Sequence, residues 1–291
     1  MSDRTLGALA ALGAVVIWGL TFAPSKVALA EMGPFTLASL RFLLALAVVG
    51  AVALPQVRQV SFRRLPWSTL ALLGLTGIAL YFGFQNLSLA RTSATDAGLI
   101  AGAVPAITAA LSVIVLGERV SPIRVAGIAT SILGVAAVIL ASGASGEPGS
   151  LAGNLLMLGA ALSWGFYTLL NKGVGGKLPE VLLLAITMAF GSLFLLPLTA
   201  VEIASGGFGP VSTEGWFSVV FLGLAGSGAS FFCWNAALRR MDASEAAIYI
   251  NLVPIITVVS AALMLGERIA PAQLLGGALV VLGVYLAGKQ G

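Results

Sequence analysis

Two stretches of the chain decide its fold: LGERVSPIRVAG at residues 116–127 and LGERIAPAQLLG at residues 265–276. Both carry Leu-Gly-Glu-Arg, a proline after two further residues and a glycine five residues beyond that proline. The offset of 149 between them also relates Asn86 to Asn235. An offset held over about 65 residues predicts that the second half of the chain repeats the fold of the first.

The composition around these stretches is that of a membrane protein. Of the 291 residues, 59% are hydrophobic and 9% are charged, and the mean hydropathy is +1.05. An average soluble protein has roughly 45–50% and 25%. This excludes a soluble domain, a disordered chain and a coiled coil, and favours an all-α polytopic membrane protein. The sequence has no histidine, which excludes imidazole chemistry, including most zinc sites and Ser-His catalysis.

Helices that cross a bilayer core of about 30 Å need about 20 apolar residues each. The first apolar run is longer than the apolar core of a signal peptide, and its pattern recurs in mid-chain, so we expect a membrane span and not a signal peptide. The Gly- and Ser-rich segment 142–150 reads as a linker between halves at 1–141 and 151–291. The sequence predicts ten spans: Leu6–Ala28, Pro34–Leu54, Trp67–Leu89, Ala94–Leu116, Pro122–Ala141, Leu151–Leu170, Leu178–Ala200, Gly215–Leu238, Ala243–Leu265 and Pro271–Gly288.

The basic residues set the expected orientation. With a cytoplasmic N-terminus, 11 of the 15 Lys and Arg residues fall on the inner side, so we expect both termini in the cytoplasm. Each half holds an odd number of spans, so the two halves are expected to be inverted relative to each other. Inverted five-helix repeats around a central cavity are typical of secondary transporters. The alternative is a duplication that only builds a larger bundle.

The repeated Leu-Gly-Glu-Arg motif, Trp18-Gly19 followed by Lys26, and Arg41 resemble the EamA-type exporters of the drug/metabolite transporter superfamily. The resemblance covers nearly the whole chain. It implies that spans 1, 3, 4, 6, 8 and 9 surround the cavity, that spans 5 and 10 brace it, and that spans 2 and 7 flank it. The aromatic residues resemble those of YddG-like amino-acid exporters.

Mixed aromatic and polar stripes mark the expected substrate site. Trp18 and Phe22 share a face of the first span, and Trp164 and Tyr167 share a face of the sixth. Such stripes line a wet cavity, pack between helices or form an interfacial belt. Further candidates for substrate contact are Tyr81, Gln85 and Asn251.

Pro105 and Pro254 interrupt the fourth and ninth spans and are the expected gating hinges, with a packing kink as the alternative. Lys26 either attracts a substrate carboxylate or extends to the outer interface. Asp96 begins the fourth span, where it fits helix capping or, alternatively, proton coupling. The two Glu-Arg turns are expected to hold ion pairs at helix ends.

These features predict a secondary transporter that exports small metabolites, most of all neutral or aromatic amino acids, by alternating access across a bacterial-type inner membrane. The alternative is a broad-specificity exporter of drugs or other metabolites. An enzyme lacks its catalytic set, and the absence of a phosphate loop argues against direct use of ATP. A further alternative is that the protein is a channel. The expected partners are a small-molecule substrate and membrane lipid, with no nucleic acid, metal or cofactor, and the expected state is a monomer.

Overall fold

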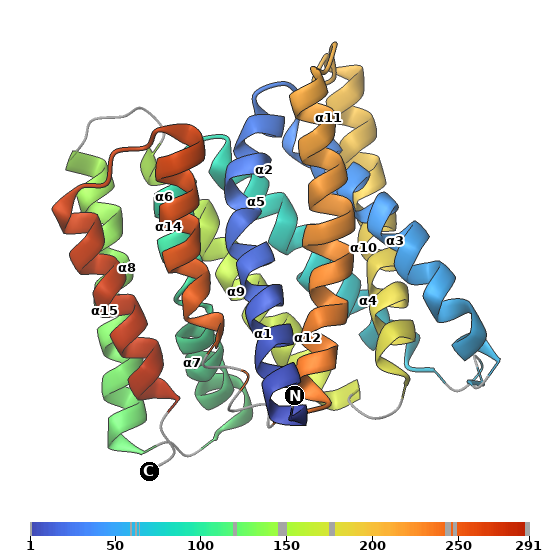
Figure 1. The fold of residues 1–291 in the computed structure, drawn as a ribbon, viewed down its shortest axis with the longest axis horizontal. Coiled ribbons are helices and arrows are strands. Elements are labelled where there is room, and N and C mark those ends of the chain that lie inside the picture. The colour runs from blue at the N-terminus through green and yellow to red at the C-terminus, as the bar shows by residue number, and fades with distance from the viewer. Residues whose placement is uncertain are drawn as a thin grey trace.

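A computed structural model shows a bundle of helices packed side by side (Figure 1). It describes residues 2–58, 60–61, 63, 65–118, 121–144, 150–174, 178–241, 246 and 249–288.

The first half begins at the N-terminus and ends before the midpoint of the chain. Its helices are α1 (Asp3–Leu20), α2 (Phe22–Leu29), α3 (Pro34–Val57), α4 (Trp67–Gly74), the π-helical segment η2 (Leu75–Leu80), α5 (Tyr81–Leu89), α6 (Ala94–Ala101), α7 (Val104–Leu116) and α8 (Pro122–Ala144).

The second half begins after residues 145–149, which form most of the expected linker and lie outside the described part. Its helices are α9 (Ser150–Val174), α10 (Glu180–Ala204), α11 (Thr213–Val220), the π-helical segment η3 (Phe221–Ala229), α12 (Ser230–Leu238), α14 (Leu252–Leu265) and α15 (Pro271–Ala287).

Most of these helices can cross a membrane. Among the described residues, seven helices or series of consecutive helices are long and apolar enough, and α6 with α7 forms an eighth candidate span bent by 40°. The helices α14 and α15 are apolar but have 14 and 17 residues. Residues 242–245 and 247–248, at the start of the expected ninth span, lie outside the described part. The protein is therefore an all-helical, multi-pass membrane protein, and the expected count of ten spans stays a prediction.

The first span is interrupted where the sequence predicts a continuous helix. Pro24 has no backbone N–H, so the carbonyl of Leu20 loses its partner in the helix. The chain breaks at Thr21, whose N–H and hydroxyl both donate to the carbonyl of Trp18, at 3.1 and 2.7 Å. The break separates Trp18 on α1 from Phe22 on α2, and the stripe expected on the first span stays a prediction.

Two π-helical segments stand at corresponding places in the two halves. The segment η2 interrupts the third span and η3 the eighth, and residues 75–80 correspond to 224–229 at the offset of 149. A π-helical turn widens a helix locally and often marks a functional site. The bounds of the third span agree with the sequence prediction, whereas its wide middle was not anticipated.

Glycines allow α8 and α15 to pack closely along their length. A Cβ atom placed on Gly127 would come within 2.3 Å of the Ala287 nitrogen, and one on Gly283 within 2.3 Å of the Ser131 nitrogen. In lipid, helices associate through such close packing rather than through a hydrophobic driving force. Large apolar side chains on the outer surface, such as Leu140 and Leu263, are exposed.

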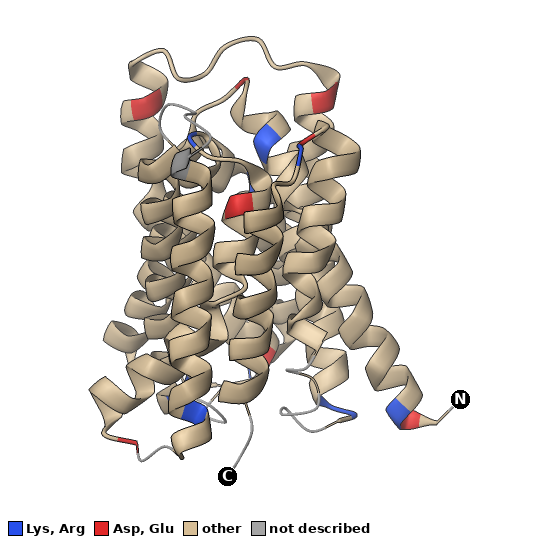
Figure 2. Ribbon diagram, turned by 90° about the vertical axis from the view of Figure 1, so that its left-hand side faces the viewer, with Lys and Arg blue, Asp and Glu red and all other residues tan. Residues whose placement is uncertain are grey.

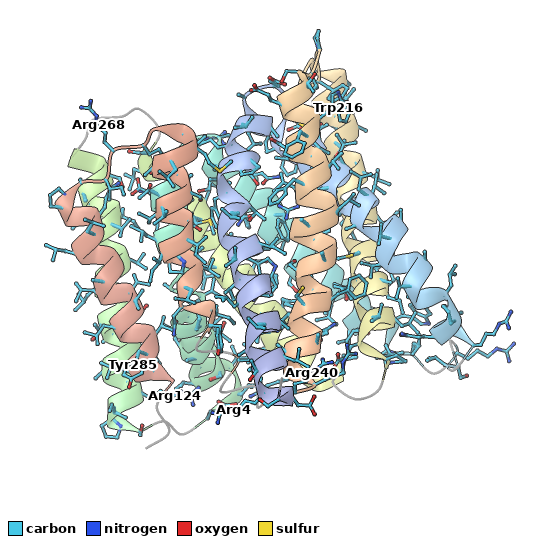
Figure 3. All side chains as sticks on the ribbon, viewed as in Figure 1. Arg4, Arg124, Trp216, Arg240, Arg268 and Tyr285 are labelled. Atoms are coloured by element: carbon cyan, nitrogen blue, oxygen red, sulfur yellow. The ribbon has the colours of Figure 1, made fainter. Side chains whose placement is uncertain are left out.

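The ends of the bundle carry the charges. In Figure 2 the charged residues lie toward the two ends of the helices, and the middle is uncharged in that view. The start of α1 and the end of α15 lie at the same end (Figure 1). Figure 3 places Arg4, Arg124 and Arg240 at this end and Arg268 at the opposite end. We call the first the terminal end and the second the distal end. The two repeated Gly-Glu turns thus lie at opposite ends.

Candidate functional site

A cavity of about 940 Å³ extends from the middle of the bundle to the terminal end. Pro105, Trp164 and Asn251 come from the middle of their spans and mark its deep end. Arg4 and Arg124 lie at the terminal end and mark its mouth (Figure 3). The remaining described lining residues are Val104, Thr108, Ala109, Ser112, Glu118, Thr168, Leu169, Lys172, Ile250, Val284, Tyr285, Ala287 and Gly288.

The wall is built by regular helical spacing. Val104, Thr108 and Ser112 recur every four residues on α7, and Trp164, Thr168 and Lys172 do so on α9. Residues four apart share a helix face. This spacing was the signal that sequence analysis missed on α7. At the terminal end α15 also contributes to the wall, although the family resemblance implies only a bracing role for it.

The breaks in two spans meet next to the cavity. The fourth span breaks at Gly102 and Ala103, ahead of Pro105, which cannot donate to the carbonyl of Ala101. Pro254 lies in the first turn of α14, and a Cβ atom on Gly102 would come within 3.1 Å of its ring. The two prolines therefore lie at facing irregular segments, and their hinge role stays a prediction.

Most of the expected aromatic residues form a layer at the deep end of the cavity. The Trp164 ring centroid lies 4.8 Å from that of Tyr81 and 4.9 Å from that of Tyr167. The Gln85 amide donates to the Tyr81 hydroxyl at 3.3 Å. Of these residues only Trp164 is among the described lining residues; Tyr81 and Tyr167 pack against its ring, and Gln85 contacts Tyr81.

The expected residues of the first span lie outside the described cavity. Trp18 packs against Trp234 and Phe231, with centroids at 5.4 and 5.8 Å. Phe22 is 4% exposed and packs in an apolar cluster that includes Leu89. The two rings therefore have different neighbours.

Hydrogen bonds across helices link the segments at the distal end. The Lys26 ammonium donates to the carbonyl of Thr92, which is neither of the two roles expected for it. Glu267 accepts from the N–H groups of Ala94 and Thr95 at 2.8 and 2.9 Å. The second Glu-Arg turn therefore caps α6 of the other half, and the expected helix-end ion pair at that turn is wrong.

Two further carboxylates bind backbone N–H groups at this end. Glu202 accepts from the N–H of Thr36 at 2.6 Å, and Glu31 accepts from the N–H of Ser212 at 2.8 Å. A carboxylate at the start of a helix is favoured because it meets unpaired N–H groups and the positive end of the helix dipole. These contacts join both halves of the chain.

Asp96 lies in the first turn of α6, as expected, but it does more than cap. Ser93 is the N-cap and accepts from the Asp96 N–H at 2.9 Å. The buried carboxylate of Asp96 accepts from Ser142 at 2.6 Å and from Gln273 at 2.7 Å, so it links α6 to α8 and α15. Its repeat equivalent, Glu245, lies outside the described residues.

The mouth of the cavity is charged. Lys172 pairs with Glu118 at 3.1 Å. Arg119, the expected partner of Glu118 in the first Glu-Arg turn, lies outside the described residues. Hydrogen bonding by Lys172, and next by Ser112, lowers the pKa of Glu118 below its usual range. Arg4 and Arg124 add two positive charges to the same mouth. Among the described residues, no three His, Cys, Asp or Glu side chains are grouped to hold a metal ion.

A bundle of apolar helices long enough to cross a membrane, with a cavity that opens at one end, is typical of membrane transporters. The model of the EamA-like transporter family matches residues 5–140 and again residues 151–288. The chain belongs to this family and is a transporter, not an enzyme.

The relatives carry transporter names. A "probable amino-acid metabolite efflux pump" of Salmonella typhimurium is 31% identical over 95% of this chain and 92% of its own. A "probable terminal-alkyne amino-acid exporter" of Streptantibioticus cattleyicolor is 30% identical over 95% and 91%. A solved crystal structure at 26% identity superposes with a TM-score of 0.64 over 98% of this chain and 96% of that chain.

Proposed function

We propose that the protein exports small zwitterionic metabolites, foremost neutral or aromatic amino acids, by alternating access across the inner membrane. The observation that carries the proposal is the cavity: an aromatic floor at Trp164 meets hydroxyl and amide groups of Thr108, Thr168 and Asn251. An amino acid offers both an apolar side chain and charged ends, which such a wall accommodates. The names of the relatives support the same substrate class.

In this proposal both termini are cytoplasmic, so the cavity faces the cytoplasm. The placement of Arg4, Arg124 and Arg240 at the terminal end supports this orientation (Figure 3). Substrate enters at the mouth and reaches the ring of Trp164. The cationic side chains there attract the carboxylate of an amino acid from the cytoplasm.

Alternating access requires that the distal contacts open when the mouth closes. Glu267, which caps α6 at the closed distal end, is the repeat equivalent of Glu118 at the open mouth. Likewise Lys26 is the equivalent of Lys172 at an offset of 146. Lys26 and Glu267 thus lie at the closed end, and their repeat equivalents Lys172 and Glu118 lie at the open end. We infer that the two halves exchange these states.

Transport by purified protein in proteoliposomes tests the proposed function. Radiolabelled neutral and aromatic amino acids are offered in counterflow, next to a lipophilic cation such as tetraphenylphosphonium. We expect saturable, counterflow-stimulated movement of at least one amino acid and none of the cation. Movement of the cation without any amino acid would replace this function with drug export.

A further inference from the structure

Arg41 is a buried cation that neither the proposed site nor the family resemblance accounts for. It lies in the third turn of α3 and is 2% exposed, one of the largest fully buried side chains in the described part. A guanidinium stays ionised in proteins and carries five N–H donors. An intramembrane charge is costly and for that reason usually has a functional partner.

The surroundings of Arg41 satisfy only part of its guanidinium. Its Nε donates to the Ser227 hydroxyl at 3.0 Å, and its Cζ lies 4.5 Å from the Phe82 ring centroid and 5.4 Å from that of Phe42. Its Nη1 is buried without a hydrogen-bond partner. Among the described residues no carboxylate forms a salt bridge with it.

Three irregular segments converge on this guanidinium. Ser227 and Gly226 belong to η3, and a Cβ atom on Gly226 would come within 3.3 Å of Nη2 of Arg41. The same atom would come within 2.8 Å of Thr21, at the break of the first span. Phe82 lies just beyond η2. Secondary transporters build their substrate sites where helices are interrupted near the middle of the membrane.

A layer of rings separates Arg41 from the cavity. Phe82 lies 4.7 Å from Tyr81, and Tyr81 lies 4.8 Å from Trp164, measured between ring centroids. Trp164 lines the cavity, so Arg41 lies beyond the floor of the site described above. In this cytoplasm-facing state the guanidinium is covered. Substrate can reach it once the Tyr81 ring has moved aside.

We propose that Arg41 binds the carboxylate of the transported substrate, with its free Nη1 as the new donor, in the step between the two facing states. A guanidinium matches the two oxygens of a carboxylate, which replaces the missing counter-ion. The substrate class is then restricted to compounds with a carboxylate. The inference rests on the proposed function only in taking that carboxylate to be the one of an amino acid.

The ligands of the test differ only at the groups in question. Calorimetric titration of the purified wild type compares phenylalanine, phenylalanine amide, phenethylamine and phenylacetate. Arg41→Gln and Arg41→Lys are measured with the same four ligands. Arg91→Gln is the matched control, because Arg91 is exposed and donates to the carbonyl of Leu87, four residues earlier at the end of α5.

We expect the wild type to bind phenylalanine at least tenfold tighter than its amide. Arg41→Gln should weaken the binding of phenylalanine about ten- to a hundredfold, as loss of a charge-assisted hydrogen bond does, and leave phenethylamine within about twofold. Arg41→Lys should fall in between, because it keeps the charge and loses the planar fork. Arg91→Gln should bind all four ligands like the wild type.

The outcomes separate the two proposals. A folded Arg41→Gln that keeps the wild-type ratio of acid to amide would show that Arg41 is only structural. If neither Arg41 variant folds, the wild-type ratio decides alone, and a ratio near one overturns the inference. Binding of phenylacetate but of no amino acid, lost in Arg41→Gln, would sink the amino-acid function and leave the carboxylate site standing. A wild type that binds no carboxylate would end both.

Discussion

At the scale of single residues, Trp164 carries most of the account of substrate binding. It lies at the deep end of the cavity and is the only member of its aromatic layer among the described lining residues. Trp164→Ala should therefore raise the half-saturating amino-acid concentration about tenfold, the equivalent of roughly 1.4 kcal/mol, through lost ring contact. Trp216→Ala is the control, since Trp216 is 43% exposed at the distal end (Figure 3). Equal counterflow curves for both variants would remove Trp164 from the site.

A second prediction at this scale concerns Gln85, whose amide donates to the hydroxyl of Tyr81, the ring next to Trp164. Gln85→Leu leaves that partly buried hydroxyl without its donor, which costs the folded protein about 1–3 kcal/mol with or without substrate. The variant should melt at a lower temperature in detergent, and amino-acid binding should weaken through displacement of the Tyr81 ring that packs against Trp164. Titration of binding checks this. Wild-type affinity would mean that the Tyr81 position does not depend on Gln85.

The ionisation of Glu118 gives a prediction about pH. A carboxyl with a pKa lowered in the folded state contributes stability above its ordinary pKa and loses it as pH falls through the lowered value. Glu118 therefore stays ionised, and paired with Lys172, from about pH 8 down to about pH 5.5. Transport by Glu118→Gln should follow the same pH profile as the wild type over this range. A wild-type inflection that the variant lacks would contradict the assignment.

At the scale of helices, the pair α8 and α15 depends on glycines that the repeat places in both halves. Gly283→Leu would force side-chain atoms onto the backbone of α8, because even a Cβ atom comes within 2.3 Å of the Ser131 nitrogen. Overpacking of this kind costs about 1–3 kcal/mol. The variant should unfold several degrees lower in detergent. Gly50→Leu is the control, since a Cβ atom on Gly50 meets only a Leu46 side-chain atom at 3.8 Å. Equal melting temperatures would count against the packing role.

The helices also show what the sequence reveals and what it does not. Starts at Pro34, Trp67 and Pro271 were predicted to the residue, since prolines and polar breaks mark the ends of apolar runs. The π-helical segments were not, because widening by one residue leaves hydropathy unchanged and depends on tertiary packing such as Tyr167 against Gly77. The break at Thr21 was not predicted, although a proline within a helix, here Pro24, indicates such a break.

The candidate site was predictable in part for a similar reason. Trp164, Asn251 and Pro105 stand out as polar, aromatic or helix-breaking residues within apolar spans, and they line the cavity. Small lining residues such as Thr108 are common in any membrane helix and carry no signal alone. The partners of Lys26 and Glu267 are backbone groups. Every residue type carries such groups, so the sequence does not indicate these contacts.

At the scale of the whole molecule, the hydrogen bonds at the distal end stabilise one of two proposed states, the one in which that end is closed. Glu267→Ala removes a cap from α6, which costs about 0.5–2 kcal/mol and acts only on the state with a closed distal end. The population should shift about two- to thirtyfold toward a distal-open state. Cys233 is the single cysteine of the sequence. A cysteine at Ser93, in a Cys233→Ser background, should then react faster with an external reagent. Glu214→Ala is the control, because Glu214 lies in the exposed first turn of α11. An unchanged reaction rate would show that the cap does not select the state.

The orientation of the molecule gives a separate prediction. Reporter enzymes fused after residue 291 and inserted at residue 147 should report cytoplasm and exterior respectively, because five spans separate the two positions in the proposed topology. An external C-terminus would reverse the direction assigned to the cavity.

The central claim is that the cavity changes sides during amino-acid export. Its most direct test uses Cys233→Ser protein with either Thr168→Cys, on the cavity wall, or Thr95→Cys, buried behind Glu267. Labelling by a membrane-impermeant maleimide is followed from each side of the membrane, with and without internal amino acid. We expect Thr168→Cys to be labelled from the cytoplasm and protected by substrate, while Thr95→Cys should react faster from outside when substrate is present. Labelling of both positions at rates that substrate does not alter would contradict it.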